Sequence, residues 1–138
     1  MKRHLCAFLF ALSSLPFLLN GAVQAQTPSL VTDQLRTTIA KTIGAQADSV
    51  EIAVRESTLT VLRVNSNMNQ STHGGRDNEA NAIGPIVAKA IAGSPDFKNL
   101  HTIRVQYVIR STPGTTDKVI DTIDFRETPS GSFEFHKT

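Results

Sequence analysis

The chain has 138 residues, of which 14 are Lys or Arg, 12 are Asp or Glu and one is a cysteine. Two of the basic residues, Lys2 and Arg3, lie in an N-terminal segment with the features of a signal peptide, and losing them leaves 12 basic against 12 acidic residues. A balanced domain lacks the basic surface that nucleic acids and anionic membranes attract, so neither is expected as a partner.

The N-terminal segment predicts export. Lys2 and Arg3 form a positive start, residues 5–19 are apolar, and Val23 and Ala25 place small side chains before a cleavage site at Gln26. The alternative is a retained membrane anchor, but the apolar run is shorter than the ~20 residues that span a bilayer, and polar residues and a proline interrupt it. We expect a signal peptide at residues 1–25, no stable membrane anchor after its removal, and a periplasmic or secreted single domain at residues 26–138.

The single cysteine, Cys6, lies within the predicted signal peptide. A domain of residues 26–138 therefore forms no internal disulfide and has no cysteine nucleophile or thiolate zinc ligand. Cys6 lies at the start of the apolar run, most of which follows it, and this is the wrong order for lipid attachment at the cleavage site. The short positive start and the lack of disulfides favour a bacterial envelope over a eukaryotic secretory route.

A first helix is predicted to begin within residues 27–29 and to stop at Gly44. Thr27 and Ser29 flank a proline in a sequence typical of helix starts, and Gly44 supplies a C-terminal stop. Apolar residues recur at i, i+4 spacing, as Val31, Leu35, Ile39 and Ile43.

Residues 49–66 change to the alternation of β-strands. A two-residue turn at Glu56 and Ser57 would place Val54 opposite Leu59 and Ile52 opposite Val61, which joins the apolar faces of two strands. The turn has neither Asn-Gly nor glycine, so one long bent strand is the alternative. We favour the hairpin.

Residues 65–78 are predicted to form a polar loop, followed by a second helix. The helical apolar positions are Ala80, Ile83, Val87, Ala90 and Ile91. Pro85 lies within this pattern, so the helix is either kinked there or begins there. Because the apolar stripe continues across the proline, we favour the kink.

The last third of the chain is predicted to be β-structure. One strand alternates from Ile103 to Ile109, a second contains Val119, Ile123 and Phe125, and a short third contains Phe133 and Phe135. The order is helix, strand, strand, helix, strand, strand, strand. It predicts an α+β fold, a single two-layer domain in which two helices cover one face of a mainly antiparallel sheet.

The segment with residues suited to ligand chemistry is the one containing His73, Gly74, Gly75 and Arg76. The glycines allow close backbone approach, and the side chains with the following helix N-terminus could bind phosphate, sulfate or carboxylate. The simpler interpretation, which we favour, is a polar linker capped by Asp77 or Asn78.

Two acidic residues of the penultimate strand are candidates for a catalytic pair. Asp121 shares a predicted face with Val119, Ile123 and Phe125, whereas Asp124 points the other way, so they form no dyad. A carboxylate on an apolar face needs a partner, and Lys118 or a neighbouring-strand arginine could provide a structural ion pair.

Other catalytic and metal motifs are lacking in the sequence. His73, His101 and His136 show no metal-ligand spacing, and there is no Gly-x-Ser-x-Gly motif. We therefore expect no catalytic residue, no metal and no cofactor.

The second face of the sheet offers a different functional hypothesis. Leu62, Val64, Val108 and Ile120 would point away from the helices, where uncovered aliphatic side chains could bind a protein partner or a second copy. The leading prediction is a small, exported, non-enzymatic binding protein that uses an open sheet face or strand edge. The alternative is a small enzyme or anion-ligand binder that uses residues 73–76.

Overall fold

The computed structural model describes residues 27–112 and 116–136, with side chains from Leu30 onward, and the predicted signal peptide lies outside them. The predicted element order and the α+β class are confirmed. The helices are α1 (Thr27–Ile43) and α2 (His73–Ala92), and short 3₁₀ turns lie at Ala47–Ser49, Asn67–Gln70 and Pro95–Phe97. The strands are β1 (Val50–Arg55), β2 (Thr58–Val64), β3 (Thr102–Ile109), β4 (Lys118–Glu127) and β5 (Phe133–His136).

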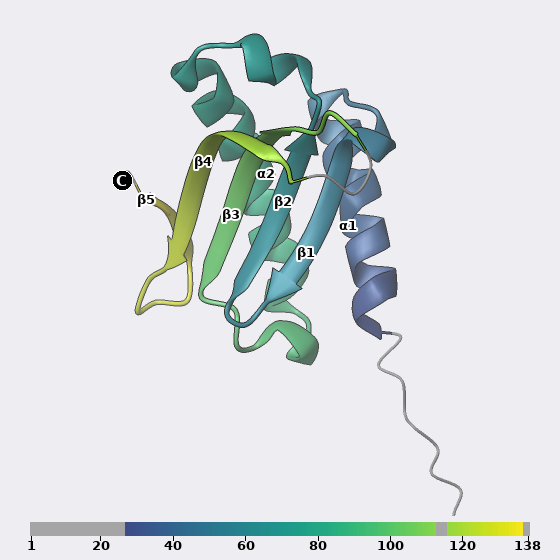
Figure 1. Cartoon of the computed structure of the whole chain (residues 1–138). Helices are drawn as coiled ribbons and strands as arrows, with labels where there is room; N and C mark the ends of the chain where they lie inside the picture. Colours follow the sequence, from purple (N-terminus) through teal and green to yellow (C-terminus); the bar gives the residue numbers. More distant parts are fainter. Residues whose placement is uncertain (1–26, 113–115, 137–138) are drawn as a thin grey trace, which may run out of the picture.

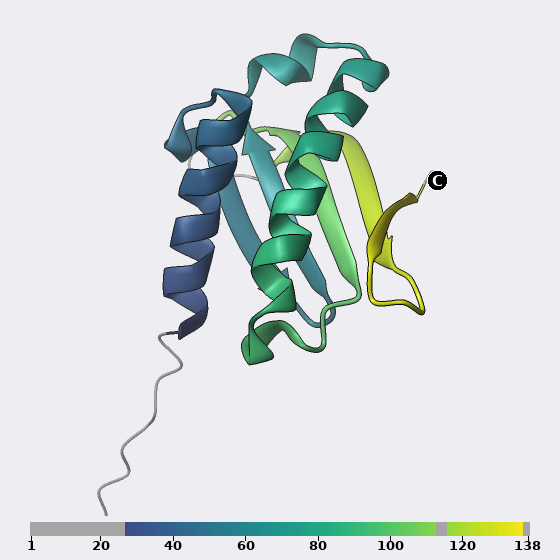
Figure 2. The same ribbon diagram turned by 180° about the vertical axis from the view of Figure 1, so that it is seen from behind.

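The five strands form one sheet in the order β1-β2-β3-β4-β5. β2 and β3 are parallel because α2 crosses over between them, and the other neighbours are antiparallel. Both helices cover the same face, so that Figure 1 looks onto the uncovered face and Figure 2 onto the helices. In the described part of the chain, neither helix combines the length and apolar character needed to cross a membrane.

The β1–β2 hairpin has the predicted register. Ile52 lies opposite Val61, and Val54 lies opposite Leu59, with Glu56 and Ser57 as the turn. Glu56 has a φ of 51°, so a residue other than glycine adopts the left-handed conformation that the tight turn requires.

The hydrophobic core fills the space between the helices and the sheet. Apolar burial of this extent is the main force that holds a domain of this size together. Its buried members include residues of both helices and of the four longer strands: Leu35, Ile39, Val50, Leu59, Val61, Ile83, Val87, Ile103, Val105, Ile123 and Phe125. Every one of them lies within residues 26–138, so that stretch contains this core.

Helix α2 begins earlier than the sequence pattern predicted. Its N-cap is Thr72, whose hydroxyl accepts a hydrogen bond from the Gly75 amide at 3.1 Å, so the prediction of a loop to residue 78 with a cap at Asp77 or Asn78 is wrong. The helix continues through Pro85, which excludes the alternative start at that proline. The consequence is that residues 73–76 form a helical turn rather than a flexible linker.

Gly84 sets how closely α2 approaches the sheet. A Cβ atom on Gly84 would lie 2.9 Å from the ring of Phe125 on β4, closer than packed carbon atoms tolerate. The lack of a side chain at Gly84 therefore lets the Phe125 ring pack directly on the helix.

Candidate functional site

The first turn of α2 is bound to β4 through the carboxylate of Asp121. Nδ1 of His73 and Nε of Arg76 each lie 2.6 Å from Oδ2 of Asp121. The backbone amide of Thr122 donates to the other carboxylate oxygen at 2.9 Å. The structure thus brings together two of the predicted ligand-binding residues, but around an acidic side chain of the protein itself.

Arg76 is almost fully engaged within the protein. Its Nη1 donates to the Ser71 carbonyl at 2.6 Å, and a longer bond reaches the Met68 carbonyl. The Arg76 and Asp121 side chains are only 11% and 13% exposed. The guanidinium of Arg76 therefore acts as a structural tie between α2, the preceding turn and β4.

The ionisation of Asp121 is set by this environment. Burial opposes the charged form, but hydrogen bonds from Arg76, His73 and the Thr122 amide outweigh it and hold the pKa of Asp121 below its ordinary value. A charged Asp121 already neutralises Arg76.

A second carboxylate lies near the same histidine. Oδ2 of Asp77 is 3.5 Å from Nε2 of His73. A phosphate or sulfate bound at His73 would therefore lie close to the carboxylates of Asp77 and Asp121, which repel it. Among the described residues, the guanidinium near His73 is that of Arg76, which is already paired with Asp121. Gly74 and Gly75 lie in the helical turn between these side chains. This geometry does not favour the anion-binding hypothesis.

Two predictions about β4 are wrong: the residues that form an ion pair with Asp121, and the side of the sheet on which Val119 lies. A register shift between β3 and β4 places Asp121 opposite Tyr107 but Val119 opposite Val108, so that Val119 lies on the other face and is half exposed. The expected structural ion pair exists, but Arg76 and His73 of the helix make it, rather than Lys118 or a neighbouring strand.

Asp124 lies on the face opposite to Asp121, as the alternation predicted. Arg104 on β3 binds both of its carboxylate oxygens, with Nε and Nη2 each at 2.8 Å. These hydrogen bonds lower the pKa of Asp124 from its ordinary value despite the burial of the carboxyl. The two aspartates therefore belong to separate ion pairs and offer no joint acid–base chemistry.

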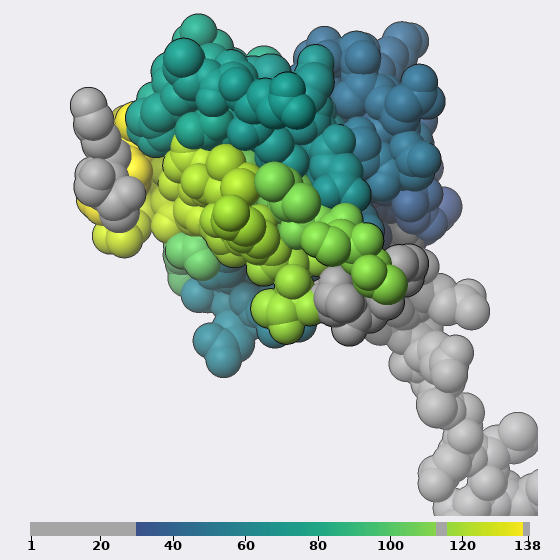
Figure 3. All heavy atoms as spheres, turned by 45° about the horizontal axis from the view of Figure 1, so that its top comes forward, coloured from purple at the N-terminus to yellow at the C-terminus, as the bar shows by residue number. Residues whose placement is uncertain are grey.

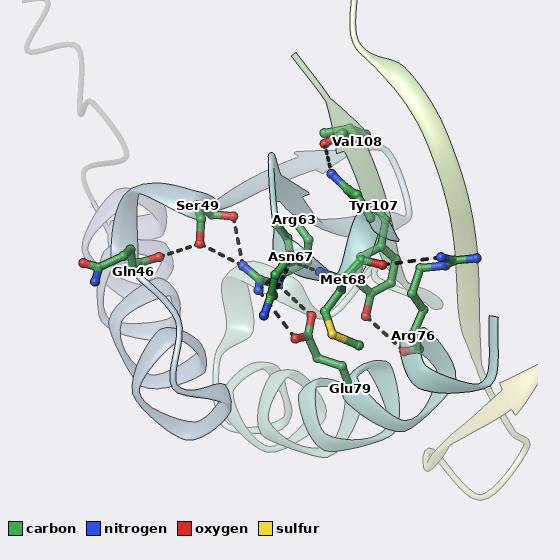
Figure 4. A network of polar contacts seen from close by, with 11 residues as sticks. Gln46, Ser49, Arg63, Asn67, Met68, Arg76, Glu79, Tyr107 and Val108 are labelled. Atoms are coloured by element: carbon green, nitrogen blue, oxygen red, sulfur yellow. Dashed lines mark hydrogen bonds and ion pairs between the residues drawn. The ribbon is translucent and has the colours of Figure 1, made fainter. Parts of the chain in front are cut away.

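A buried ion pair that the sequence reasoning missed joins β2 to α2. Nε of Arg63 lies 2.8 Å from Oε1 of Glu79, and the two side chains are 3% and 11% exposed. The other guanidinium nitrogens donate to Ser49 and to the hydroxyl of Ser66. Figure 4 shows Arg63 between Ser49 and Glu79. The sequence alternation could have indicated this ion pair. Arg63 shares the apolar face of its strand with Leu59 and Val61, and a charged side chain on that face needs a partner.

Tyr107 extends the same buried layer toward the start of α2. Its hydroxyl donates to the carbonyl of Arg76 at 3.0 Å, which Figure 4 also shows. Burial, with the nearby charge of Glu79, raises the pKa of Tyr107 above its ordinary value. Tyr107 is therefore a neutral hydrogen-bond donor that fixes the first helical turn.

Two pockets lie at opposite ends of the helix layer. One, of about 470 Å³, is lined by the chain after α1 and by Arg63 to Asn67. The Arg63 guanidinium at its wall is already bonded to Glu79, Ser49 and Ser66. The other, of about 670 Å³, lies between the end of α2 and the β4–β5 turn and is lined by apolar side chains such as Phe97, Leu100 and Phe133. Neither contains a cluster of catalytic side chains.

The three histidines in the described residues have separate partners. His73 is bonded to Asp121, His101 is bonded to Glu127 at the end of β4, and His136 lies opposite Asp124 on β5. Within the described residues, no group of three His, Cys, Asp or Glu side chains could hold a metal ion.

The predicted aliphatic surface is mostly covered. Val108 is fully buried and Val64 is 8% exposed, whereas Leu62 is half-buried. The beginning of β4 bends across this end of the sheet, and its atoms form part of the green-to-yellow band in Figure 3. Val64 and Val108 thus offer almost no apolar surface to a partner.

Arg110 closes the same end of the sheet. It follows β3 and reaches across β2 to Glu51 on β1, with Nη1 2.6 Å from Oε1, while its Nε lies 2.7 Å from Oδ1 of Asp117. The guanidinium therefore bridges two carboxylates over the strand that carries Leu62.

The rest of the uncovered face is mostly polar, apart from Ala53, Leu62 and the half-exposed Val119. We call it the open face and define it by three rows of residues that lie opposite one another across the strands. They are Arg55, Thr58, Thr102, Arg126 and Glu134; Ala53, Thr60, Arg104, Asp124 and His136; and Glu51, Leu62, Gln106 and Thr122. Most of these residues are half-buried or exposed.

Comparisons with known proteins provide no functional assignment. No protein-family model, no curated protein and no solved structure matches the chain. Function must therefore be argued from the geometry of the domain.

Proposed function

We propose that the chain is a small, exported, non-enzymatic binding protein of the bacterial envelope or secretome, which binds its partner through the open face. The signal-peptide pattern of residues 1–25 supports export. The placement of both helices on the other face of the sheet supports the choice of surface (Figures 1 and 2).

The observation that carries the proposal is the first row of the open face. Arg55, Thr58, Thr102 and Arg126 lie opposite one another across four strands, and no ion pair or hydrogen bond engages their side chains among the described residues. Strands lie ~4.8 Å apart, so the two arginines are about 14 Å apart. Two guanidinium groups and two hydroxyls are thus available to a partner.

The second row strengthens the argument. The hydroxyl of Thr60 also has no bonding partner among the described residues, and it lies beside the Arg104–Asp124 ion pair. Thr60 has a short side chain and the Arg104 guanidinium is already held by Asp124, so a partner that hydrogen-bonds these two groups meets little side-chain ordering cost. The surface suits a polar partner rather than the apolar one first expected from Leu62, Val64 and Val108.

The test is a cross-linked pull-down with three baits made from residues 26–138: the native sequence, Thr60→Lys and Asn81→Lys. The first substitution alters the middle of the open face, and the second adds the same charge at an exposed position of α2. Mass spectrometry identifies what each bait retains from an envelope extract of the cells that express the protein.

We expect one protein to be retained in near-equal amount by the native and Asn81→Lys baits and lost with Thr60→Lys. Equal retention by all three baits would contradict the assignment of the open face. If the native bait retains no other protein, the result would contradict a protein-binding function. In that case the shift in Tm caused by small anions, and its loss in Arg76→Ala, becomes the next measurement.

A further inference from the structure

The outer edge of β5 carries an exposed aromatic side chain. β5 is the last strand of the sheet, and Phe135 on it is 39% exposed. Its inner side packs edge-on against Phe125, with ring centroids 5.9 Å apart and an interplanar angle of 73°. Edge strands are commonly protected from further pairing by charge, proline or short length. β5 has four residues and one charged side chain, Glu134, but it contains no proline and alternates aromatic with polar residues.

The two faces of β5 have different chemistry. Phe133 and Phe135 lie on the helix side of the sheet, because they are opposite Glu127 and Phe125 of β4. Glu134 and His136 lie on the open face. Figure 2 shows β5 at the rim of the sheet, beyond α2 and far from α1, so a further strand at this edge would not meet α1.

This edge is complementary to itself. Antiparallel pairing about a two-fold axis perpendicular to the sheet keeps each residue opposite one on the same face. When Phe135 lies opposite Phe135 of the second copy, Glu134 lies opposite His136 of that copy, and this pair occurs twice. The register joins two aromatic rings on one side of the sheet and two acid–histidine pairs on the other.

The neighbouring register is disfavoured by charge. If the two-fold axis passed through Glu134 instead, Glu134 of one chain would lie directly opposite Glu134 of the second chain. Like charges at directly opposite positions destabilise a strand pair. We therefore propose that β5 pairs with β5 of a second copy of this chain, with Phe135 on the two-fold axis, so that the two sheets become one and both open faces lie on the same side.

The proposal predicts a weak dimer. Only a few residues of each strand pair, so the buried area is below the ~1,200 Å² of stable interfaces. The proposed binding function does not depend on it, and the dimer is measured on the purified chain alone.

Disulfide trapping tests the register. Residues 26–138 contain no cysteine, so one introduced thiol reports on a single contact. Directly opposite residues of antiparallel strands have Cα atoms ~4.5–5.5 Å apart, within the range that a disulfide requires. The variant is Phe135→Cys, and the matched control is Val54→Cys on the other edge strand, where the native side chain is 42% exposed.

We expect Phe135→Cys to form a disulfide-linked dimer under mild oxidation at least several times faster than Val54→Cys. In the Phe135→Cys background, Glu134→Lys and His136→Glu should each slow cross-linking. The two together should restore it, because the introduced lysine of one copy then faces the introduced glutamate of the other. Circular dichroism confirms that each variant is folded. Equal rates for the two cysteine variants, or single charge changes without effect, would overturn the proposal.

Sedimentation equilibrium of the native residues 26–138 provides a second measurement. The average mass should rise with concentration for the native chain and stay at the monomer value for Glu134→Lys. A constant monomer mass for the native chain up to millimolar concentration would also overturn it.

Discussion

Arg63 and Glu79 form an ion pair inside the domain, with Nε 2.8 Å from Oε1 and side chains 3% and 11% exposed. The guanidinium also binds Ser49, before β1, and Ser66, after β2. A single arginine thus ties three segments of the chain to α2. Desolvation of the two charges is offset only because every donor nitrogen has an acceptor.

Removal of one partner should be far more damaging than removal of both. Glu79→Ala leaves Arg63 buried without its counter-charge, and we expect it to lower the free energy of unfolding by about 3–5 kcal/mol. Urea titration of residues 26–138 measures the loss. The double variant Arg63→Met/Glu79→Leu should be more stable than Glu79→Ala, and a double variant that is less stable would refute this account.

The contact between Gly84 and Phe125 predicts a position-specific effect of alanine. Gly84→Ala places a Cβ 2.9 Å from the Phe125 ring, and we expect it to lower the free energy of unfolding by about 1–3 kcal/mol. Gly74→Ala in the same helix has open space around its Cβ and should raise it by about 0.5–1 kcal/mol. Thermal and urea unfolding compare the two, and effects of the same sign would contradict the packing argument.

Local patterns were sufficient to predict most of the fold. Strand alternation fixed the hairpin register, because only one pairing joins Ile52 and Val54 to Val61 and Leu59 on one face. The i, i+4 spacing likewise predicted α1 to within a residue of its C-terminal end.

Contacts between distant residues explain what could not be predicted. Gly74 and Gly75 disfavour a helix, yet the Thr72 cap and the bond from Arg76 to Asp121, 45 residues away, hold them in one. The burial of Val108 likewise depends on the beginning of β4, which bends across that end of the sheet. Neither the cap nor the bend at the start of β4 leaves a periodic signal in the sequence.

The β1–β2 turn contains a strained residue. Glu56 has a φ of 51°, a conformation that asparagine adopts more readily than glutamate. Glu56→Asn should therefore raise the free energy of unfolding by about 0.5–1 kcal/mol in urea titration. Ser57→Asn, at the neighbouring position without a positive φ, should change it by less than about 0.5 kcal/mol. Equal gains at both positions would show that backbone strain at Glu56 is not the cause.

The Asp121 ion pair predicts how the domain responds to acid. The pKa of Asp121 is lower in the folded chain than its ordinary value of about 4, so its charge stabilises the fold above that pH and the stabilisation is lost as pH falls through the folded-state value. Asp121→Asn should lower the free energy of unfolding by about 1–3 kcal/mol at pH 7, since Arg76 loses a charged acceptor.

The difference between the native and Asp121→Asn chains should therefore shrink as the pH falls below about 4, where the Asp121 carboxylate becomes protonated. Urea titrations at a series of pH values measure it, and Asp33→Asn, which alters an exposed ion pair on α1, serves as the control with little effect at any pH. A difference that persists unchanged to about pH 2 would mean that the Asp121 side chain stabilises the start of α2 by packing and neutral hydrogen bonds, with no contribution from its charge.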